Sequence, residues 1–382
     1  MPESPRPWQV LLLGATGFCG SFLAKELDAR RVVWAAAARR PRPMPGDAPC
    51  VHLDLSDHGA LTALVRRADV VLSALGPALT VAEPVLAACV AARTHYLDIT
   101  GETPWVAQMV ARWSGPAQAA GLRLVCNAGF ESIPCDLGVL DLARWHRERG
   151  VGLRRVLALA EARAGVNGGT LASVEALANA SLYREARGDD AGPWARFHPE
   201  LRTWSGRHPT AGVDSWVLRR SAALAAAAGA PYGEKFAFEL RWRATSAAGA
   251  LARSAGVALL HRLFEDPRSR RFLLRLGPRT GEGPRSHKVH QGFFSILLRA
   301  QAEDGRWASV FWRGAGDPGS LVTARLAVAA ALRLRERAEQ TDPTDFGVLT
   351  PARGLGLEFL RLLPPSISYA LTPSPPLSPN GA

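Results

Sequence analysis

The sequence predicts a doubly wound α/β sheet followed by a second domain of the α+β class, and three features of its 382 residues carry this prediction. Residues 9–126 alternate six short apolar runs with helical patterns, and most of these runs lack the period-two alternation of a half-exposed strand. The first run ends in glycines spaced three residues apart, in VLLLGATGFCG. After about residue 140, strand-like runs flank the hairpin signal Glu303-Asp304-Gly305, which indicates antiparallel pairing.

The first domain is expected to contain six parallel strands with helices on both faces of the sheet. The strands are predicted at residues 9–14, 31–38, 50–54, 69–76, 95–99 and 122–127. The helices are predicted at residues 21–29, 59–67, 83–92 and 103–120. Thr103-Pro104 gives the last of these helices a good entry, because proline is tolerated in the first turn. This alternation predicts a Rossmann-type dinucleotide-binding domain over residues 1–140.

The second domain is expected to span residues 141–363. Its strands are predicted at residues 154–163, 234–244, 293–301 and 307–314, and its helices at 171–187, 247–276, 321–338 and 353–363. Apolar residues and arginines mix over 247–276, which is typical of a helix packed on the sheet with its arginines in solvent. The alternatives are a helix on the inner face of a membrane or over an acyl channel. Residues 364–382 contain six prolines, and this composition predicts a disordered tail.

The net charge of +12 is carried almost wholly by arginine, since only three of the 46 basic residues are lysine. Such a composition reflects a GC-rich genome and is weak support for nucleic-acid binding, which calls for a clustered basic patch with aromatic side chains. The five cysteines form no Cys-x-x-Cys pair, so we expect reduced thiols, no metal site and a cytoplasmic location. No apolar stretch of about eighteen residues is free of charge, so no transmembrane helix is expected.

The glycines after the first strand have the spacing of a pyrophosphate cradle. In such a site the first glycine allows a tight turn, and later ones let the backbone approach the pyrophosphate and the helix pack on the sheet. The helix N-terminus offers free N–H groups and the positive end of its dipole. The expected contacts of the cofactor are Gly14, Thr16, Gly17, Phe18, Cys19 and Gly20. The alternative is a strand that ends in a glycine-rich turn without a ligand.

The end of the second strand selects the nucleotide. An NAD site has Asp or Glu there to bind the ribose hydroxyls, but this chain reads Ala38-Arg39-Arg40. Two guanidinium groups suit the 2′-phosphate of NADP, and the alternative is a solvated arginine run. Asp54 is expected either to reach the adenine amino group or to cap the helix that begins near Ser56.

The ends of the fourth and fifth strands hold the candidates nearest the reacting atoms. Leu75, Gly76 and Pro77 follow the fourth strand and are expected to line the nicotinamide side. Tyr96, on the fifth strand, is the first candidate for a catalytic hydrogen-bond donor, and Glu102 beyond it is the candidate charged or acid group. The alternatives are a packed sheet tyrosine and a carboxylate that caps the following helix.

From residue 76 onward the sequence resembles the saccharopine dehydrogenase-like oxidoreductases. The segment GPALTVAEPVLAACVAARTHYLDITGETPW is similar to a family segment with Gly-Pro-Tyr, Ala-Cys, Gly-Thr-His-Tyr-x-Asp-x-Thr-Gly-Glu and Trp. GFESIPCDLG at 129–138 resembles the family's Gly-Phe-Asp-Ser-Ile-Pro-Ser-Asp-Leu-Gly. Further matches are GGTLAS, DSWVLRRS, GEGPRS, GDPGSLVTA and GVLTPARGLG. The resemblance covers roughly residues 9–363 and is closest to the trans-acting enoyl reductase branch.

The resemblance implies an NADP-dependent oxidoreductase that reduces a C=C bond of an enoyl, acyl or polyketide-lipid intermediate carried by a synthase or CoA. Ala78 and Ser320 stand where the family has tyrosine, and Glu131 stands where it has aspartate. The lost tyrosines keep two other functions open. One is a non-catalytic NADP-binding or membrane-associated scaffold, and the other is a saccharopine-like reductase of an amino-acid-derived imine.

Polar residues after the sixth strand and in later glycine-rich turns are the candidates for substrate contacts. A glycine-rich turn that opens a helix suits an anion or a carbonyl, and a basic residue after paired glycines suits a phosphopantetheine or a carboxylate. A surface loop is the alternative for Arg285 and Ser286. These candidates are Ser132, Asn167, Thr170, Ser173, Arg285 and Ser286.

Overall fold

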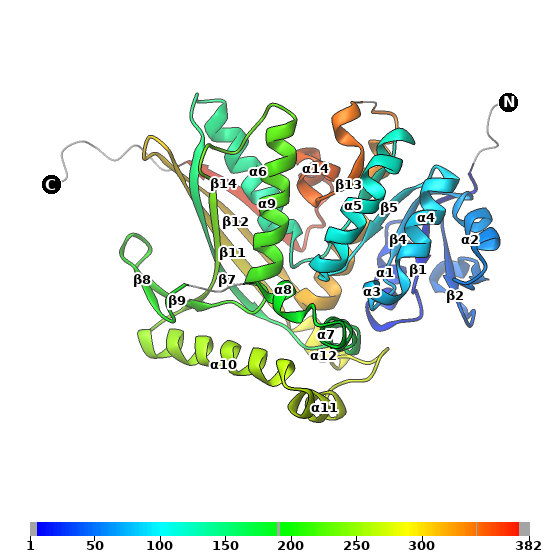
Figure 1. Ribbon diagram of the computed structural model, residues 1–382, viewed down its shortest axis with the longest axis horizontal. Coiled ribbons are helices and arrows are strands. Elements are labelled where there is room, and N and C mark those ends of the chain that lie inside the picture. The colour runs from blue at the N-terminus through cyan, green and yellow to red at the C-terminus, as the bar shows by residue number, and fades with distance from the viewer. Residues whose placement is uncertain (1–5, 189–191, 341, 374–382) are drawn as a thin grey trace.

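The computed structural model describes residues 6–188, 192–340 and 342–373. These residues form two sheets of seven strands each, one parallel and one mixed (Figure 1). The blue and cyan N-terminal part contains the parallel sheet, and the long green and yellow strands belong to the mixed sheet. The predicted fold class, a doubly wound sheet with a second domain built on its own sheet, is therefore confirmed.

The parallel sheet has the strand order of a dinucleotide-binding domain, β3-β2-β1-β4-β5-β6, extended by β13. Its strands are β1 (Trp8–Leu13), β2 (Trp34–Ala38), β3 (Cys50–His52), β4 (Ala68–Ser73), β5 (His95–Asp98), β6 (Arg123–Val125) and β13 (Gly347–Leu349). Leu11 pairs with Ala35 on one side and Val71 on the other, and all three are fully buried. The order reverses between β1 and β4, so their carboxyl ends form the crevice where such sheets bind ligands.

The helices of this domain follow the predicted pattern with shifted boundaries. They are α1 (Phe18–Ala29), α2 (His58–Val65), α3 (Ala78–Val81), α4 (Glu83–Ala92) and α5 (Thr103–Ala119). The first begins three residues before the predicted position, directly behind Gly17. Asp57, and not Asp54, caps α2, because its carboxylate accepts the N–H of Ala60 at 2.8 Å.

The mixed sheet has the order β14-β12-β11-β7-β10-β9-β8. Its strands are β7 (Leu153–Arg163), β8 (Arg196–His198), β9 (Thr203–Arg207), β10 (Ala237–Ala244), β11 (Phe293–Ala302), β12 (Trp307–Ala315) and β14 (Ile367–Pro373). Only the β7–β10 pair among these strands is parallel, and β11 and β12 form the predicted hairpin. The helices α6 (Ile133–Arg147) and α9 (Ala211–Ala227) contact this sheet, and α10 (Ala247–Glu265) runs along β9 and β10.

Four shorter helices lie below the two sheets in the view of Figure 1. They are α7 (Gly168–Asn179), α8 (Tyr183–Arg187), α11 (Pro267–Leu276) and α12 (Ser286–His290). The single helix predicted over 247–276 is divided into α10 and α11 at Asp266-Pro267, because Asp266 adopts an extended conformation and caps the second helix. The helix predicted over 171–187 is likewise divided, into α7 and α8.

The C-terminal part of the chain returns to the parallel sheet, which corrects the expectation that residues 141–363 form the second domain. α13 (Thr323–Glu336) packs against α1, β4 and β5, and β13 pairs in parallel with β6. The edge of β6 is covered in this way, since an uncovered edge strand leaves backbone groups unpaired. β13 is only three residues long, too short to be recognised from its composition.

A second correction concerns the predicted tail. Ile367–Pro373 forms the edge strand β14, which pairs antiparallel with β12 from Gly314 to Ala308. Alternate residues of this strand are buried or half-buried. The many prolines around it hide this alternation in the sequence. Residues 374–382 of the predicted tail lie outside the described residues.

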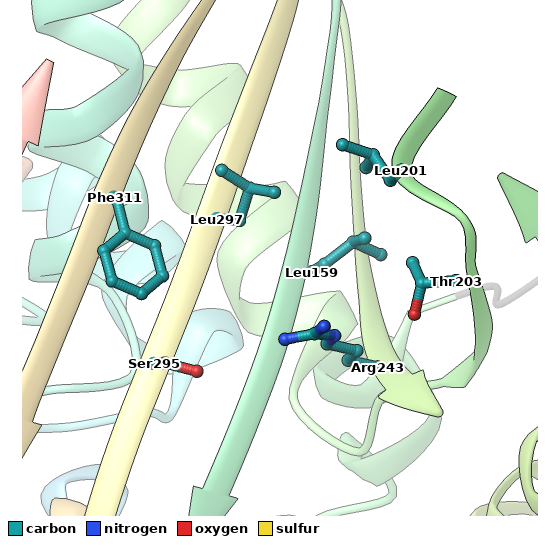
Figure 2. Close-up of a pocket in the computed structure, with 7 residues that line it drawn as sticks. All are labelled: Leu159, Leu201, Thr203, Arg243, Ser295, Leu297 and Phe311. Carbon is teal, nitrogen blue, oxygen red and sulfur yellow. The ribbon is translucent and has the colours of Figure 1, made fainter. Parts of the chain in front are cut away.

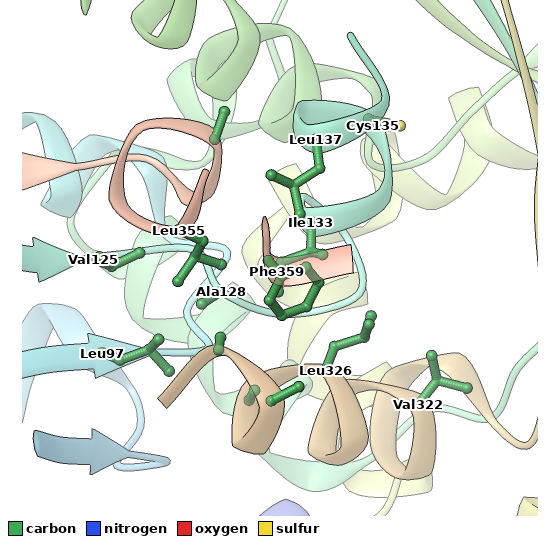
Figure 3. Packing of buried hydrophobic residues seen from close by; sticks show 14 of the residues in the cluster. Leu97, Val125, Ala128, Ile133, Cys135, Leu137, Val322, Leu326, Leu355 and Phe359 are labelled. Carbon is green, nitrogen blue, oxygen red and sulfur yellow. The ribbon is translucent and has the colours of Figure 1, made fainter. Parts of the chain in front are cut away.

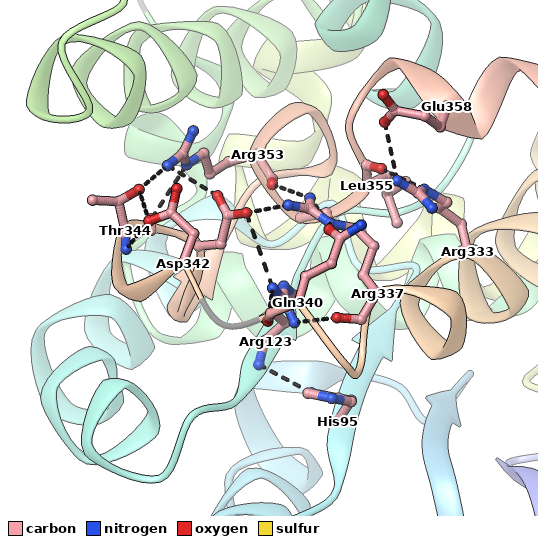
Figure 4. A network of polar contacts seen from close by, with 12 residues as sticks. His95, Arg123, Arg333, Arg337, Gln340, Asp342, Thr344, Arg353, Leu355 and Glu358 are labelled. Atoms are coloured by element: carbon pink, nitrogen blue, oxygen red, sulfur yellow. Dashed lines mark hydrogen bonds and ion pairs between the residues drawn. The ribbon is translucent and has the colours of Figure 1, made fainter.

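A network of arginines binds this returning segment to β6 (Figure 4). Arg123, on β6, is fully buried and donates to the backbone carbonyls of Arg337 and Gln340 at 2.8 Å each. Arg337 in turn pairs with Asp345, which also pairs with Arg353 at 2.9 Å. Charge-assisted hydrogen bonds of this kind satisfy buried carbonyls that would otherwise be left without partners.

One apolar core extends from the parallel sheet to the helices that pack against the mixed sheet (Figure 3). Leu97 and Val125 point from β5 and β6 toward Leu326 of α13 and Ile133 of α6. Phe359, which is fully buried, fills the centre of this group. The two sheets therefore share a packed interior.

Candidate active site

The glycine turn after β1 is so tight that a side chain is excluded at two positions. Gly14 has a φ of +82°, which glycine adopts without strain, and a Cβ there would lie 2.9 Å from the carbonyl carbon of Ala74. A Cβ on Gly20 would lie 2.0 Å from the carbonyl oxygen of Gly14. Gly17 donates its N–H to the same oxygen at 3.0 Å. The turn therefore has the close helix–strand packing that a pyrophosphate cradle requires.

The first turn of α1 opens toward the crevice. Gly17 is its N-cap, the first turn has no acidic residue, and no described side chain accepts the N–H groups of this turn. Thr16 is exposed, and Phe18 and Cys19 are partly exposed beside it. Free N–H groups at the positive end of a helix dipole bind phosphate, so these residues fit the pyrophosphate of a dinucleotide.

Two exposed arginines follow the second strand of the parallel sheet. Arg39 and Arg40 are exposed directly after β2, and no described carboxylate pairs with either of them. Asp54 is occupied, because it accepts the N–H and the hydroxyl of Ser56 at 2.9 and 2.7 Å. These hydrogen bonds lower the pKa of Asp54. The guanidinium groups of Arg39 and Arg40 are therefore free to bind a phosphate group at this position.

The end of β4 is open, as expected for a surface that lines the nicotinamide. Gly76 is exposed, and a Cβ built on it would meet nothing within 4 Å. Leu75 and Pro77 on either side are partly exposed. Ala78 follows in α3 and is buried, so a tyrosine at this position would need space that α3 does not leave.

Glu102 fixes the elements around this opening. It is buried, and its two carboxylate oxygens accept the N–H groups of Ala78 and Leu79, both at 2.8 Å. Ser173 of α7 donates its hydroxyl to the same carboxylate at 2.6 Å. With both oxygens occupied, Glu102 anchors α3 and α7 beside the crevice. The geometry favours the capping alternative, although the capped helix is α3 and not α5.

Tyr96 is fully buried in the core formed with α4 and α5, and no surface reaches it. Burial raises the pKa of its phenol well above the usual value. The neighbouring Asp98 accepts the N–H groups of Thr100 and Asn127 at 3.0 and 3.1 Å, and its burial raises the pKa of its carboxyl to about 6. This environment favours the packed-tyrosine alternative over a catalytic role for Tyr96.

Glu131 is a candidate acid that the sequence shows only as a departure from the aspartate of the family motif. Glu131 follows β6 and is partly exposed. A Cβ on Gly129 would lie 2.7 Å from its Oε2, and one on Gly101 would lie 3.9 Å from its Oε1. The carboxyl therefore lies over the glycine-lined ends of β5 and β6. Its place directly after the sixth strand was the signal in the sequence.

Burial, with the nearby charge of Asp98 adding to it, raises the pKa of Glu131 to about 7. The carboxyls of Glu131 and Asp317 both lie close enough to the thiol of Cys19 for their charges to interact with it. The thiol of Cys19 has its pKa raised to about 12, by burial first and then by the charges of Glu131 and Asp317. A carboxyl with a pKa near neutrality is suited to general acid–base catalysis, because it both holds and releases a proton at that pH.

The second domain closes the far side of the crevice. Asp317 accepts the N–H of Gly165 at 2.5 Å and the hydroxyl of Ser320 at 2.7 Å, which joins the loop before α7 to the turn η3 (Pro318–Val322). Cys19 donates its Sγ–H to the carbonyl of Gly319 at 3.5 Å. The glycine turn is thus tied directly to the second domain, and Ser320 has a structural partner where the family has tyrosine.

The remaining predicted substrate residues divide between the crevice and the surface. Asn167 caps α7 by accepting the N–H of Thr170 at 3.0 Å, so these two residues and Ser173 lie on the helix that faces α1 and α3. Ser132 is fully buried beside Glu131, and its hydroxyl has no hydrogen-bond partner among the described residues.

Arg285 and Ser286 are exposed at the start of α12. The loop before them packs on the glycine turn, since a Cβ on Gly283 would lie 2.5 Å from the ring of Phe18. Gly168 of α7 donates its N–H to the carbonyl of Glu282 in the same loop at 2.9 Å. This loop therefore borders the cofactor cradle, and the two residues stand at its outer end.

Two hollows on the mixed sheet are formed by other residues. The first is lined by Leu159, Leu201, Thr203, Arg243, Ser295, Leu297 and Phe311 (Figure 2). The second, of about 620 Å³, shares Ser295 and Phe311 with it. Their linings contain no carboxyl, imidazole or thiol group.

Residues 10–125 match the family model described as the saccharopine dehydrogenase NADP binding domain. This part of the chain is therefore similar to a saccharopine dehydrogenase NADP-binding domain. The match confirms the predicted resemblance and NADP(H) as the cofactor, with the glycine turn as the start of the matched region. The predicted oxidoreductase class is confirmed with it.

Several curated proteins named trans-acting enoyl reductase are similar to almost the whole chain. Trans-acting enoyl reductases of Mycobacterium tuberculosis and Mycobacterium bovis are 29% identical to this chain over 414 residues, covering 95% of this chain and 97% of each relative. A trans-acting enoyl reductase of Mycobacterium ulcerans is 28% identical with the same coverage. The similarity therefore extends over the NADP-binding domain and the mixed sheet alike.

Among solved structures, the apo saccharopine dehydrogenase (L-Glu forming) of Saccharomyces cerevisiae is similar to this chain with a TM-score of 0.54 and 13% identity. The match covers 96% of this chain and all of that one, so the two proteins share a fold. Within residues 6–188, 192–340 and 342–373, no helix combines the length and apolar character needed to cross a membrane. The same residues contain no cluster of three or more metal-ligating side chains.

Proposed function

We propose that this protein uses NADPH to reduce the C=C bond of an enoyl thioester, in an acyl or polyketide-lipid intermediate bound to CoA or a carrier. Similarity to trans-acting enoyl reductases over 95% of the chain carries this proposal. The acid at Glu131, where the parallel strands end, supports it. We place the reaction in the cytoplasm, with peripheral contact to the inner face of the membrane.

The chain's own residues would hold the cofactor along the crevice. Gly14 to Gly20 and the first turn of α1 bind the pyrophosphate, and the guanidinium groups of Arg39 and Arg40 bind the 2′-phosphate. Leu75 to Pro77 line the nicotinamide side. When bound, NADPH supplies a hydride to the β carbon of the enoyl group.

Glu131 would supply the proton that completes the reduction. Hydride addition at the β carbon leaves negative charge on the thioester enolate, and a proton must then reach the α carbon. Glu131 in its neutral form donates that proton and takes up another from solvent before the next turnover. Glu102, Ala78 and Ser173 hold α3 and α7 in place around the reacting atoms.

NADPH oxidation in the presence of enoyl thioesters of increasing chain length tests this function. We expect turnover that rises with chain length, followed as loss of NADPH absorbance. Tight NADPH binding without turnover at any length would favour the non-catalytic scaffold. Turnover only with an amino acid and a keto acid would favour the imine reductase.

Replacing both Arg39 and Arg40 by alanine is expected to lower the affinity for NADPH and leave that for NADH unchanged. A hydrogen bond to a charged group contributes roughly 1.5–3 kcal/mol, so the loss should be roughly tenfold or more. Titration with each nucleotide measures the ratio. Arg154→Ala, an exposed arginine of β7, is the control and should bind both nucleotides normally. Equal weakening for both nucleotides would contradict a 2′-phosphate site.

A further inference from the structure

The helices α10 and α11 carry the most exposed of the large apolar side chains that the structure describes. Leu276, Phe272 and Leu259 are 70%, 62% and 57% exposed, more than any other large apolar side chain among the described residues. Phe272 and Leu276 are four residues apart, so they share one face of α11. Leu273, on the adjacent face of α11, is half-buried against the small core formed with α7 and α8. The side chains of Phe272 and Leu276 are therefore left largely uncovered.

Arginines flank these apolar side chains. Arg268, Arg271 and Arg275 are exposed on α11. Only Arg268 has a carboxylate beside it, since its charge adds to the hydrogen bonds that lower the pKa of Asp266. No described carboxylate forms an ion pair with Arg271 or Arg275. The two acidic residues nearby are occupied. Asp266 caps α11, and Glu265 pairs with two arginines of α8. The outward face of α11 is thus both apolar and uniformly basic.

We propose that α10 and α11 form a docking surface for an anionic lipid bilayer. An amphipathic helix with bulky apolar residues on one face and arginines at its margins lies in the plane of the interface, with its apolar groups below the head groups. The arginines then contact anionic head groups. Leu251 and Leu259, eight residues apart on α10, are also exposed, by 48% and 57%. Figure 1 places both helices along one edge of the molecule, away from α6 and α9.

This orientation brings the cofactor crevice to the bilayer, and that consequence rests on the proposed function. The loop that leaves α11 reaches the site, because Gly277 packs on Leu171 of α7 and Gly283 packs on Phe18 of the glycine turn. An apolar acyl chain could then enter beside α7 without crossing much water.

Charge argues against a second copy of this chain as the occupant. A two-fold contact places the same face of each copy against the other. The arginines of both copies of α11 would then face one another without a carboxylate between them, and like charges in contact are unfavourable. Anionic lipid complements the same face.

Co-sedimentation of the full-length protein with vesicles tests the proposal. We expect binding to phosphatidylcholine vesicles that contain phosphatidylglycerol, little binding to phosphatidylcholine alone, and weaker binding at high salt. Each arginine near an anionic surface contributes roughly fivefold in partitioning, so Arg271→Ala with Arg275→Ala should weaken binding roughly 25-fold. Phe272→Ala with Leu276→Ala should also weaken it. Phe311→Ala, an exposed aromatic residue of the mixed sheet, is the control and should bind normally.

Absence of binding to either vesicle, or equal binding by both double variants and the control, would overturn the proposal. Self-association in sedimentation velocity that the same double variants abolish would also overturn it, in favour of a second copy. NADPH titration of each variant should be unchanged, which shows that the fold is intact. Reduction of short soluble enoyl thioesters is measured separately, so vesicle binding without turnover would count against the proposed function alone.

Discussion

Gly20→Ala is expected to abolish NADPH binding. The added methyl group would lie 2.0 Å from the carbonyl oxygen of Gly14, far inside van der Waals contact. That oxygen cannot retreat easily, because it accepts the N–H of Gly17 and belongs to a residue fixed at a φ of +82° between β1 and Ala74. The start of α1 must therefore move away from the strand, which removes the N–H groups that would face the pyrophosphate.

The expected loss of affinity is at least hundredfold, measured by titration of NADPH into the purified variant. Overpacking of a tight site also destabilises a protein by roughly 1–3 kcal/mol, so the melting temperature should fall. Gly256→Ala is the matched control, because Gly256 lies in α10 and an added Cβ meets nothing within 4 Å. Alanine is the better helix former, so this control should bind NADPH normally and melt no lower. Normal NADPH binding by Gly20→Ala would mean that the cofactor lies elsewhere.

The parallel sheet could be predicted because its signals are local. Each of the first six strands is an apolar run bounded by turn residues, and the strand order follows from the right-handed connection of strand, helix and strand. The return of β13 could not be predicted in the same way. Its three residues carry almost no pattern, and its position depends on Arg123 contacting carbonyls more than two hundred residues away.

The positions of the candidate site residues could be predicted from the sequence, but the roles of the individual side chains could not. The position of a residue at the end of a strand follows from the pattern, so the segments at Gly14, Gly76 and Glu131 could all be placed at one edge of the sheet. The burial of Tyr96 and the three hydrogen bonds received by Glu102 depend on α4, α5 and α7 packing together. Such contacts join distant parts of the chain, and residue type alone does not reveal them.

Glu131→Gln is expected to lower kcat for enoyl reduction by about hundredfold or more while NADPH affinity stays the same. Glutamine keeps the shape of the side chain and its hydrogen-bonding capacity but has no acidic proton, and a general acid contributes roughly 10²–10⁴ in rate. Glu131→Asp restores the acid one methylene further back, at the residue type of the family motif, and should recover part of the rate. Glu148→Gln, an exposed carboxylate of no assigned role, should leave kcat unchanged.

The pH profile separates a proton donor from a structural side chain. The pKa of Glu131 is raised to about 7, so the carboxyl is neutral below that pH and loses its proton above it. Since the neutral form donates the proton, kcat should fall as pH rises through about 7 in the natural protein. Glu131→Gln should lose this inflection and Glu131→Asp should retain one, shifted in pH. Cys19, Asp98 and Asp317 face the same region, but only loss of the carboxyl at 131 should remove the inflection. An unchanged rate and an unchanged profile in Glu131→Gln would show that the proton comes from solvent or another group.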